Sequence, residues 1–475
     1  MKKEDFNQLV INYLQTEPTE GQKNAITTFM NFVCCKEQQK VMLLQGYAGT
    51  GKTSLISAFV HALNACGIET VLLAPTGRAA KVLGAYAAKK ASTVHREIYR
   101  MKMDKDAGLT LQQNVNKHKN AFFFVDEASM LYDDPTSNGN DWFRDSYLLS
   151  HLFEYIEQGS NCRLVLIGDN AQLPPVGLNE SPALDAVLLK DRYSQLVFEC
   201  ELKDVVRQQQ QSDILFNATK IRHLLTSGAH KDYQIHCQKE NSDVKIISRS
   251  EILEEIENAY NQSGMENTVA IVRTNKQANM LNQAIRNRIL WRDEILQHSD
   301  LLMNVKNNYY WLSHEKKQAD LIANGDILKV IKVYDIENKY NMDFADVSLQ
   351  LLDTEEKIFE AKIILSSLYT DTPALPYEQW RELFFAIEKD YMDIVPRSQR
   401  FKKIKTDPYL NAMQVKFAYA QTCHKTQGGG WDTVFVDKGY VPENEIKQDY
   451  YRWLYTAITR AKEKLFWIEE GTNIN

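Results

Sequence analysis

A glycine-rich segment of this chain has the residue types and the spacing of a phosphate-binding loop. Residues 46–53 read Gly-Tyr-Ala-Gly-Thr-Gly-Lys-Thr, directly after the apolar run 41–44 and before a helical pattern that includes 54–60. In such a turn, successive backbone N–H groups point at a phosphate, and the following helix adds the positive end of its dipole. Lys52 would reach the β- and γ-phosphates, and the Thr53 hydroxyl would ligate Mg²⁺. The pattern predicts a nucleoside triphosphate site formed by Gly46, Gly49, Thr50, Gly51, Lys52, Thr53 and Ser54.

Two further polar segments also follow apolar runs. Asp126 and Glu127 come directly after 122–125, and Gln172 follows the run 164–167 within a few residues. A P-loop enzyme needs one carboxylate near Mg²⁺ and its bound waters, and a second carboxylate to polarise the attacking water. We assign Asp126 to Mg²⁺ through water and Glu127 to catalysis. The Gln172 amide is predicted to hydrogen-bond the γ-phosphate or the attacking water.

The elements that must position these residues alternate short apolar runs with helical periodicity. Strands that are apolar throughout and separated by helices are typical of a parallel, doubly wound sheet, whose ligands bind beyond the carboxyl ends of the strands. The same alternation of apolar runs and helical patterns recurs in the second half of the chain and predicts a second α/β lobe. The predicted strands are 41–44, 70–74, 121–125 and 164–167 in the first lobe and 269–272, 433–436 and 464–467 in the second.

Residues 326–410 have a different pattern and are predicted to be an insertion into the second lobe. Alternating apolar and polar residues at 327–333 and 346–352 indicate a small antiparallel barrel, and 377–392 is predicted to be helical. The run 396–405 is basic and contains no acid. It is predicted either to contact a nucleic acid or to be a solvated face.

Composition limits the class of protein. The chain has 475 residues, which is too long for one hydrophobic core and predicts two or more domains. Its seven cysteines include no CxxC pair, which fits a reducing cytosol and a cytoplasmic location. No apolar run is long enough to cross a bilayer, so no membrane partner is expected. Because the net charge is −6, any polyanion must bind in a local basic groove.

Eight segments occur in the order of a known motif set. They are 19–25, 73–80, 91–95, 125–130, 168–176, 205–207, 422–428 and 455–461. Together they resemble the superfamily 1 helicases of the RecD/Dda type, a branch associated with 5′→3′ movement on single-stranded DNA. The resemblance extends from about residue 19 to residue 467.

The resemblance implies a fold of two RecA-like doubly wound lobes. The first lobe (1–200) would carry a β-hairpin insertion at about 96–120. The second lobe (201–475) would be interrupted at about 326–410 by an SH3-like barrel with a helix. The segment Tyr99–Leu111 would be the strand-separating pin, although a surface hairpin without that role also fits its pattern. The polar insertion Tyr132–Trp142 is a departure from the family pattern and has no predicted function.

The resemblance also implies residue roles. Gln22 would read the adenine of ATP, and Arg207 and Arg460 of the second lobe would clamp the γ-phosphate. The implied cofactors are ATP and Mg²⁺. The implied activity is an ATP-dependent DNA helicase, acting as a monomer on single-stranded and forked DNA, with single-stranded DNA-binding, repair or replication proteins as candidate partners. DNA contacts would come from Pro75, Thr76, Thr93, His95, Thr422, His424 and Lys425.

Two alternatives stay open at this level. One is an ATP-gated nucleic-acid binding or remodelling protein that does not unwind duplexes. The other is RNA as the substrate, because donors aimed at backbone phosphates do not distinguish ribose from deoxyribose without contacts to the 2′-OH.

Overall fold

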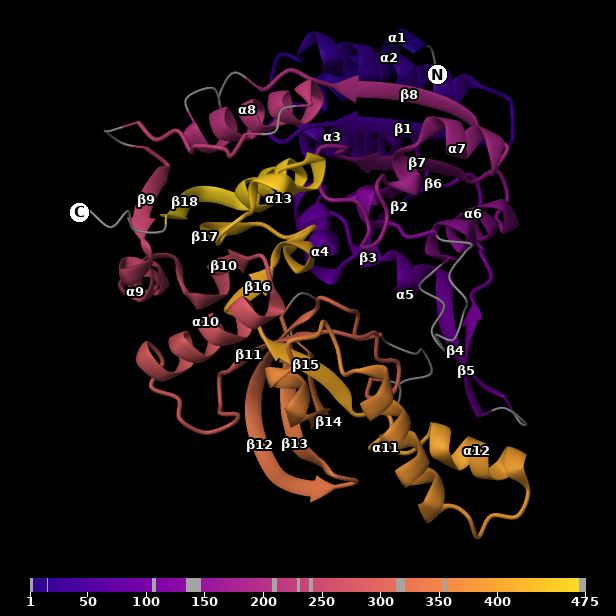
Figure 1. The fold of residues 1–475 in the computed structure, drawn as a ribbon. Coiled ribbons are helices and arrows are strands. Elements are labelled where there is room, and N and C mark those ends of the chain that lie inside the picture. Colours follow the sequence, from indigo (N-terminus) through magenta and orange to yellow (C-terminus); the bar gives the residue numbers. More distant parts are fainter. Residues whose placement is uncertain are drawn as a thin grey trace, which may run out of the picture.

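The computed structural model describes residues 3–14, 16–104, 108–133, 147–206, 212–228, 231–238, 242–312, 321–352 and 357–469. Three sequence predictions concern residues outside these ranges, namely Arg207, residues 134–142 of the polar insertion and residues 105–107 at the centre of the predicted pin. The described residues form two parallel sheets with helices on their faces, a closed barrel and a two-stranded hairpin (Figure 1).

The first sheet has six parallel strands in the order β3-β2-β6-β7-β1-β8. This order places the carboxyl ends of β6, β7 and β1 side by side, and these three strands precede the predicted catalytic residues. The strands are β1 (Lys40–Gly46), β2 (Thr70–Ala74), β3 (Ala91–Thr93), β6 (Phe122–Val125), β7 (Arg163–Gly168) and β8 (Leu196–Leu202).

Helices cover both faces of this sheet because successive strand residues point to opposite sides. Met42 and Leu44 of β1 belong to a cluster with Phe29 and Phe59, whereas Val41 and Leu43 belong to a separate cluster on the opposite face. The first lobe is therefore doubly wound, as predicted. Its helices are α1 (Lys3–Leu14), α2 (Glu20–Cys34), α3 (Lys52–Ala65), α4 (Gly77–Tyr86), α5 (Val94–Ile98), α6 (Leu148–Gln158) and α7 (Ala186–Asp191).

The second sheet has five parallel strands in the order β16-β10-β17-β18-β9. It confirms the predicted second α/β lobe. The strands are β9 (Val244–Ser248), β10 (Thr268–Val272), β16 (Ala420–Thr422), β17 (Trp431–Asp437) and β18 (Ala461–Glu469). The helices are α8 (Asp213–Ser227), α9 (Ile252–Ser263), α10 (Asn275–Arg288) and α13 (Gln448–Ile458).

A closed five-stranded barrel lies below the second lobe in Figure 1. Its strands are β11 (Leu301–Asn304), β12 (Ile327–Lys339), β13 (Met342–Leu351), β14 (Lys357–Ile364) and β15 (Met413–Phe417). The prediction of a purely antiparallel barrel is wrong in one place, since β14 and β15 pair in parallel. The chain between them passes through α11 (Tyr377–Asp390) and α12 (Arg397–Lys405). A connection of this length allows the chain to re-enter the barrel in the same direction.

The barrel strands β11 and β15 lie outside the predicted insertion 326–410, and β8 crosses the predicted lobe boundary at residue 200. The domain boundaries stay a prediction. The hairpin pairs β4 (Tyr99–Asp104) with β5 (Gly108–Gln113) in antiparallel register, and α12 contacts β5 (Figure 1). Within the described part of the chain, no helix combines the length and the apolar character needed to cross a bilayer.

Candidate functional site

The predicted phosphate-binding loop joins β1 to α3. Gly49 and Gly51 have φ angles of 75° and 78°, which favour glycine because a Cβ is strained there. No side chain caps the N-terminus of α3, in contrast to α2 and α4, which threonines cap. The N–H groups at this helix end are thus left for an external anion. The loop fits a triphosphate in backbone shape and in the donors that it offers.

Lys52 extends over the same loop. Its Nζ donates to the carbonyl oxygens of Gly46 at 2.5 Å and Tyr47 at 3.0 Å, and it lies 3.9 Å from Oδ2 of Asp169. Thr50 is buried and donates its hydroxyl to the Tyr47 carbonyl, whereas Thr53 is half-buried and Ser54 is exposed. The ammonium group therefore lies against the loop, and its contact with the β- and γ-phosphates stays a prediction.

Asp126 and Glu127 follow β6 at the centre of the sheet. The Glu127 N–H donates to Oδ1 of Asp126 at 2.9 Å, and Glu127 itself has a left-handed backbone with φ of 52°. Burial, and then the negative charge of Glu127, raise the pKa of Asp126 to about 6. A divalent cation bound nearby would favour the ionised form, so the carboxylate is suited to an Mg²⁺ shell together with Thr53.

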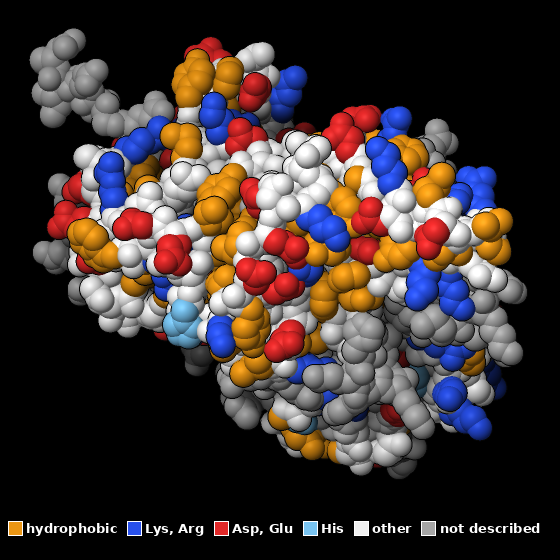
Figure 2. All heavy atoms as spheres, turned by 90° about the horizontal axis from the view of Figure 1, so that it is seen from below, with side chains coloured by type: hydrophobic (Ala, Val, Ile, Leu, Met, Phe, Trp, Pro, Cys, Tyr) orange, Lys and Arg blue, Asp and Glu red, His pale blue; other side chains and the backbone are white. Residues whose placement is uncertain are grey.

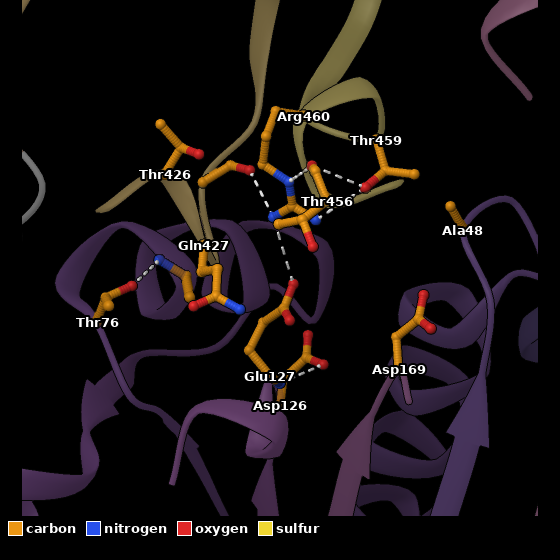
Figure 3. Close-up of polar contacts among 12 residues, drawn as sticks. Ala48, Thr76, Asp126, Glu127, Asp169, Thr426, Gln427, Thr456, Thr459 and Arg460 are labelled. Carbon is orange, nitrogen blue, oxygen red and sulfur yellow. Dashed lines mark hydrogen bonds and ion pairs between the residues drawn. The ribbon is translucent and has the colours of Figure 1, made fainter. Parts of the chain in front are cut away.

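Arg460 comes from the second lobe, two residues after α13 ends. Its guanidinium is buried, with Nε donating to the Thr456 carbonyl at 3.1 Å and Nη1 donating to the Gly429 carbonyl at 3.1 Å. Nη1 also lies 3.9 Å from Oε1 of Glu127, and Figure 3 shows the side chain pointing across the lobe boundary. The structure brings Arg460 beside the first-lobe carboxylates. Its role in hydrolysis stays a prediction.

The other predicted arginine, Arg207, lies outside the described residues. The chain just before it runs along the phosphate-binding loop, because the Val206 N–H donates to the Gly49 carbonyl at 3.0 Å. Gln22, predicted to read adenine, is buried. Its amide oxygen accepts the Thr19 N–H at 3.0 Å, and its Nε2 donates to the Thr50 carbonyl at 3.3 Å. Gln22 thus joins α2 to the loop, and the adenine contact stays a prediction.

The predicted DNA contacts of the first lobe differ in exposure. Pro75 and Thr76 are half-buried, and the Thr76 hydroxyl caps α4 by accepting the Ala79 N–H. Thr93 is fully buried, with its hydroxyl accepting the Arg96 N–H at 3.2 Å, and His95 is buried as well. In this conformation the Thr93 hydroxyl is a helix cap. The four DNA contacts stay predictions.

The predicted DNA contacts of the second lobe, Thr422, His424 and Lys425, are half-buried. Lys425 donates to Oδ1 of Asn324 at 2.6 Å, and burial followed by the charge of Lys416 lowers its pKa to about 8. Burial, and then Lys425, also lower the pKa of His424. Lys416 is buried and has its pKa lowered to about 8 by burial. Among the described residues, neither lysine forms an ion pair with a carboxylate. A bound anion would stabilise these poorly solvated cations.

Comparisons with known proteins agree with this geometry. The family model of an AAA domain matches residues 17–249, and that of a UvrD-like helicase C-terminal domain matches residues 417–468. The ATP-dependent DNA helicase Dda of Enterobacteria phage T4 is 25% identical over 484 residues, covering 95% of this chain and 99% of that protein. Together these matches support a superfamily 1 helicase of the Dda and RecD type.

Two further proteins are similar to this chain over different lengths. The ATP-dependent RecD2 DNA helicase of Deinococcus radiodurans is 30% identical over 188 residues, which is 39% of this chain and 22% of that protein. The solved structure of the Pif1 helicase from Bacteroides with ADP-AlF3 and ssDNA covers 96% of this chain and 94% of that chain, at 15% identity and a TM-score of 0.46.

The sequence-based predictions did not include Asp169 and Tyr455 as site residues. Oδ2 of Asp169 accepts the Tyr455 hydroxyl at 2.7 Å, and the same hydroxyl accepts the N–H of Ala48 at 2.8 Å. Burial raises the pKa of Asp169, while Lys52 opposes that shift. The position of Asp169 directly after a buried strand was the available signal. Nothing in the sequence around Asp169 indicates its hydrogen bond with Tyr455, which lies 286 positions further along the chain.

Proposed function

We propose that this chain is an ATP-dependent DNA helicase that hydrolyses ATP between its two lobes and moves 5′→3′ on single-stranded DNA. The observation that carries the proposal is the approach of Arg460, from the second lobe, to within 3.9 Å of Glu127 in the first. Lys52 follows β1 and Asp126 follows β6, at the same edge of the first sheet and with β7 between the two strands. The charges that would act on a triphosphate are thus divided between two bodies.

This division of charge between the two lobes can couple ATP hydrolysis to a movement of the lobes. A ligand shifts a conformational equilibrium only if it binds one state better than the other. ATP would gain contacts with Arg460 only when the lobes are closed, and loss of the γ-phosphate would remove that gain. Mg²⁺, held by Thr53 and through water by Asp126, would neutralise charge on the phosphates when bound. Within the protein, Glu127 would orient and polarise the attacking water.

DNA is proposed to run across the surface formed by the segments at 75–76 and 422–425. The two segments belong to different lobes, yet the lobes meet close to them, since a Cβ added to Gly428, three residues after the second segment, would lie 3.1 Å from Oγ1 of Thr76. The buried Lys416 and the half-buried Lys425 would favour phosphate groups in their neighbourhood. Acidic and basic side chains are interspersed on the face that carries the barrel (Figure 2), so local cations, not a uniform field, would hold the strand. Donors aimed at phosphates predict sequence-tolerant binding.

The central experiment is ATP hydrolysis by the purified chain with and without single-stranded DNA. We expect DNA to stimulate turnover, because closure of the lobes on the strand would bring Arg460 to the phosphates. Single-stranded RNA of the same sequence is the matched competitor. Equal stimulation by RNA would favour the RNA alternative, and no stimulation by either would refute the proposal.

Strand separation is proposed to depend on the hairpin of β4 and β5. In the test variant, residues 101–111 of the hairpin are replaced by a short glycine linker. The unwinding activity and the DNA-stimulated ATP hydrolysis of this variant are each compared with those of the wild-type chain. We expect unwinding to be lost while hydrolysis is retained. Unchanged unwinding would remove the hairpin as the pin. A wild-type chain that hydrolyses ATP on DNA without unwinding a fork would instead favour the ATP-gated binding protein.

Polarity is tested with two duplexes that differ only in the overhang. We expect unwinding of the duplex with a 5′ overhang, and a preference for the 3′ overhang would refute the proposed direction. A reducing, cytoplasmic setting is part of the proposal, and the seven cysteines are free in this structure.

A further inference from the structure

The loop that carries Gln172 is held by the second lobe although it belongs to the first. Oδ2 of Asp169, at the start of this loop, accepts the Tyr455 hydroxyl at 2.7 Å. At the other end, the Leu173 N–H donates to Oγ1 of Thr456 at 2.9 Å, and the Leu173 carbonyl accepts Nε2 of Gln427 at 2.6 Å. Gln172 lies between these two fixed points.

The loop is also packed into the second lobe. Ala171 and Leu173 are buried in the hydrophobic cluster formed by β10, β17, β18, α8 and α13. Within the loop, Oδ1 of Asp169 accepts the Ala171 N–H and the Asp169 carbonyl accepts the Gln172 N–H. The loop is therefore short, internally bonded and in contact with the second lobe at both ends.

The side chain of Gln172 is available for another partner. It is buried, and its Oε1 accepts no hydrogen bond from any described residue. A buried acceptor without a donor is unfavourable, and such groups often mark the place of an absent ligand or water. This orphaned oxygen fits the predicted contact with the attacking water.

We propose that Tyr455, Thr456 and Gln427 are positioning residues that set the place of Gln172 when the lobes close. The inference rests on the proposed function, in which Gln172 contacts the γ-phosphate or the attacking water. Under this inference, closure of the lobes would bring Gln172 and Arg460 to the γ-phosphate together. Thr456 holds the Leu173 N–H through its hydroxyl and the Arg460 Nε through its carbonyl, so the arginine and the glutamine move as one unit.

Tyr455 adds a link to the phosphate-binding loop. Its hydroxyl donates to Asp169 while accepting the N–H of Ala48, and Asp169 in turn lies 3.9 Å from the Lys52 Nζ. Burial, and then the charge of Asp169, raise the pKa of Tyr455 well above its usual range, so the phenol keeps its proton at neutral pH. One hydroxyl thereby joins α13 to two first-lobe loops of the site.

The test is a double-mutant cycle on the kcat of ATP hydrolysis with Tyr455→Phe and Gln172→Ala. Loss of a hydrogen bond to a charged group predicts a fall in kcat of about tenfold to a hundredfold for Tyr455→Phe. The KM for ATP should change by less than about threefold, because Lys52 and the loop glycines are retained. If Tyr455 acts through Gln172, its substitution in the Gln172→Ala background should change kcat by less than about twofold.

The matched control is Tyr450→Phe. Tyr450 lies on the same helix, is buried, and donates its hydroxyl to the carboxylate of Asp232, which belongs to the second lobe alone. Its substitution removes the same kind of bond without touching the loop, so kcat should stay within about twofold of wild type in both backgrounds. Chemical unfolding of each variant separates loss of stability from loss of position.

Independent, multiplying effects of Tyr455→Phe and Gln172→Ala would overturn the inference, as would an unchanged kcat for Tyr455→Phe. The kcat values of the double-mutant cycle are measured for ATP hydrolysis both with and without single-stranded DNA. Failure of DNA to stimulate the wild-type chain would count against the proposed function, while the cycle on basal turnover would still decide the positioning role.

Discussion

Removal of the Arg460 guanidinium tests the division of charge between the lobes. Its Nη1 lies 3.9 Å from Oε1 of Glu127, and the group is buried. Two unit charges about 4 Å apart interact by about 4 kcal/mol at an effective dielectric constant of about 20. If Arg460 lies at a similar distance from the charge that develops on the γ-phosphate, a stabilisation of this size corresponds to about 10³ in rate, at 1.36 kcal/mol for each tenfold change. The value lies at the lower end of the range of roughly 10³–10⁵ attributed to arginine fingers.

We therefore expect Arg460→Ala to lower the DNA-stimulated kcat about a thousandfold. The KM for ATP should change less, because the phosphate-binding loop belongs to the other lobe. Arg460→Lys should recover part of the loss, since it keeps the charge but loses the paired bonds to the Thr456 and Gly429 carbonyls.

The assay is steady-state ATP hydrolysis at saturating single-stranded DNA, with DNA binding measured separately without nucleotide. The control is Arg249→Ala, because Arg249 pairs with Asp437 at 2.9 Å on an exposed part of the same lobe. That variant should keep wild-type turnover within about twofold, as exposed pairs contribute little. A folded Arg460→Ala protein with kcat within tenfold of wild type would refute the division of charge.

Three further substitutions address the first-lobe residues. Lys52→Ala should nearly abolish hydrolysis, since the ammonium group is the cation that lies on the loop; retained turnover would contradict its role. Glu127→Gln should keep ATP binding, measured with a fluorescent nucleotide, while turnover is lost; normal turnover would exclude it as the catalytic carboxylate. Asp126→Asn should stabilise the nucleotide-free chain by roughly 1–2 kcal/mol at pH 7.5 and by much less at pH 4.5. The reason is that folding raises the pKa of Asp126 to about 6, so the stability contributed by its protonated form is lost as the pH rises from about 4 to 6. Chemical unfolding at the two pH values checks this, and an equal effect at both would contradict the shift.

Much of the fold could be predicted because the relevant signals are local. Buried parallel strands such as β2 (Thr70–Ala74) and β10 (Thr268–Val272) are apolar throughout, so each can be recognised without its neighbours. The strand β8 (Leu196–Leu202) was missed. It lies at the edge of the first sheet, and its two glutamates, Glu199 and Glu201, interrupt the apolar run.

In the candidate site, too, local features could be predicted from the sequence, whereas contacts between distant residues could not. The amino-acid sequence alone determined the phosphate-binding loop, because the positive φ angles at Gly49 and Gly51 and the lysine after them are set by neighbouring residues. Only the tertiary structure decided that Asp169 meets Tyr455, that Thr456 holds Leu173, and that β14 pairs with β15 in parallel. These contacts join residues far apart in the chain. The first two contacts are selected by the packing of one lobe on the other and the third by closure of the barrel, and neither leaves a periodicity in the segments involved.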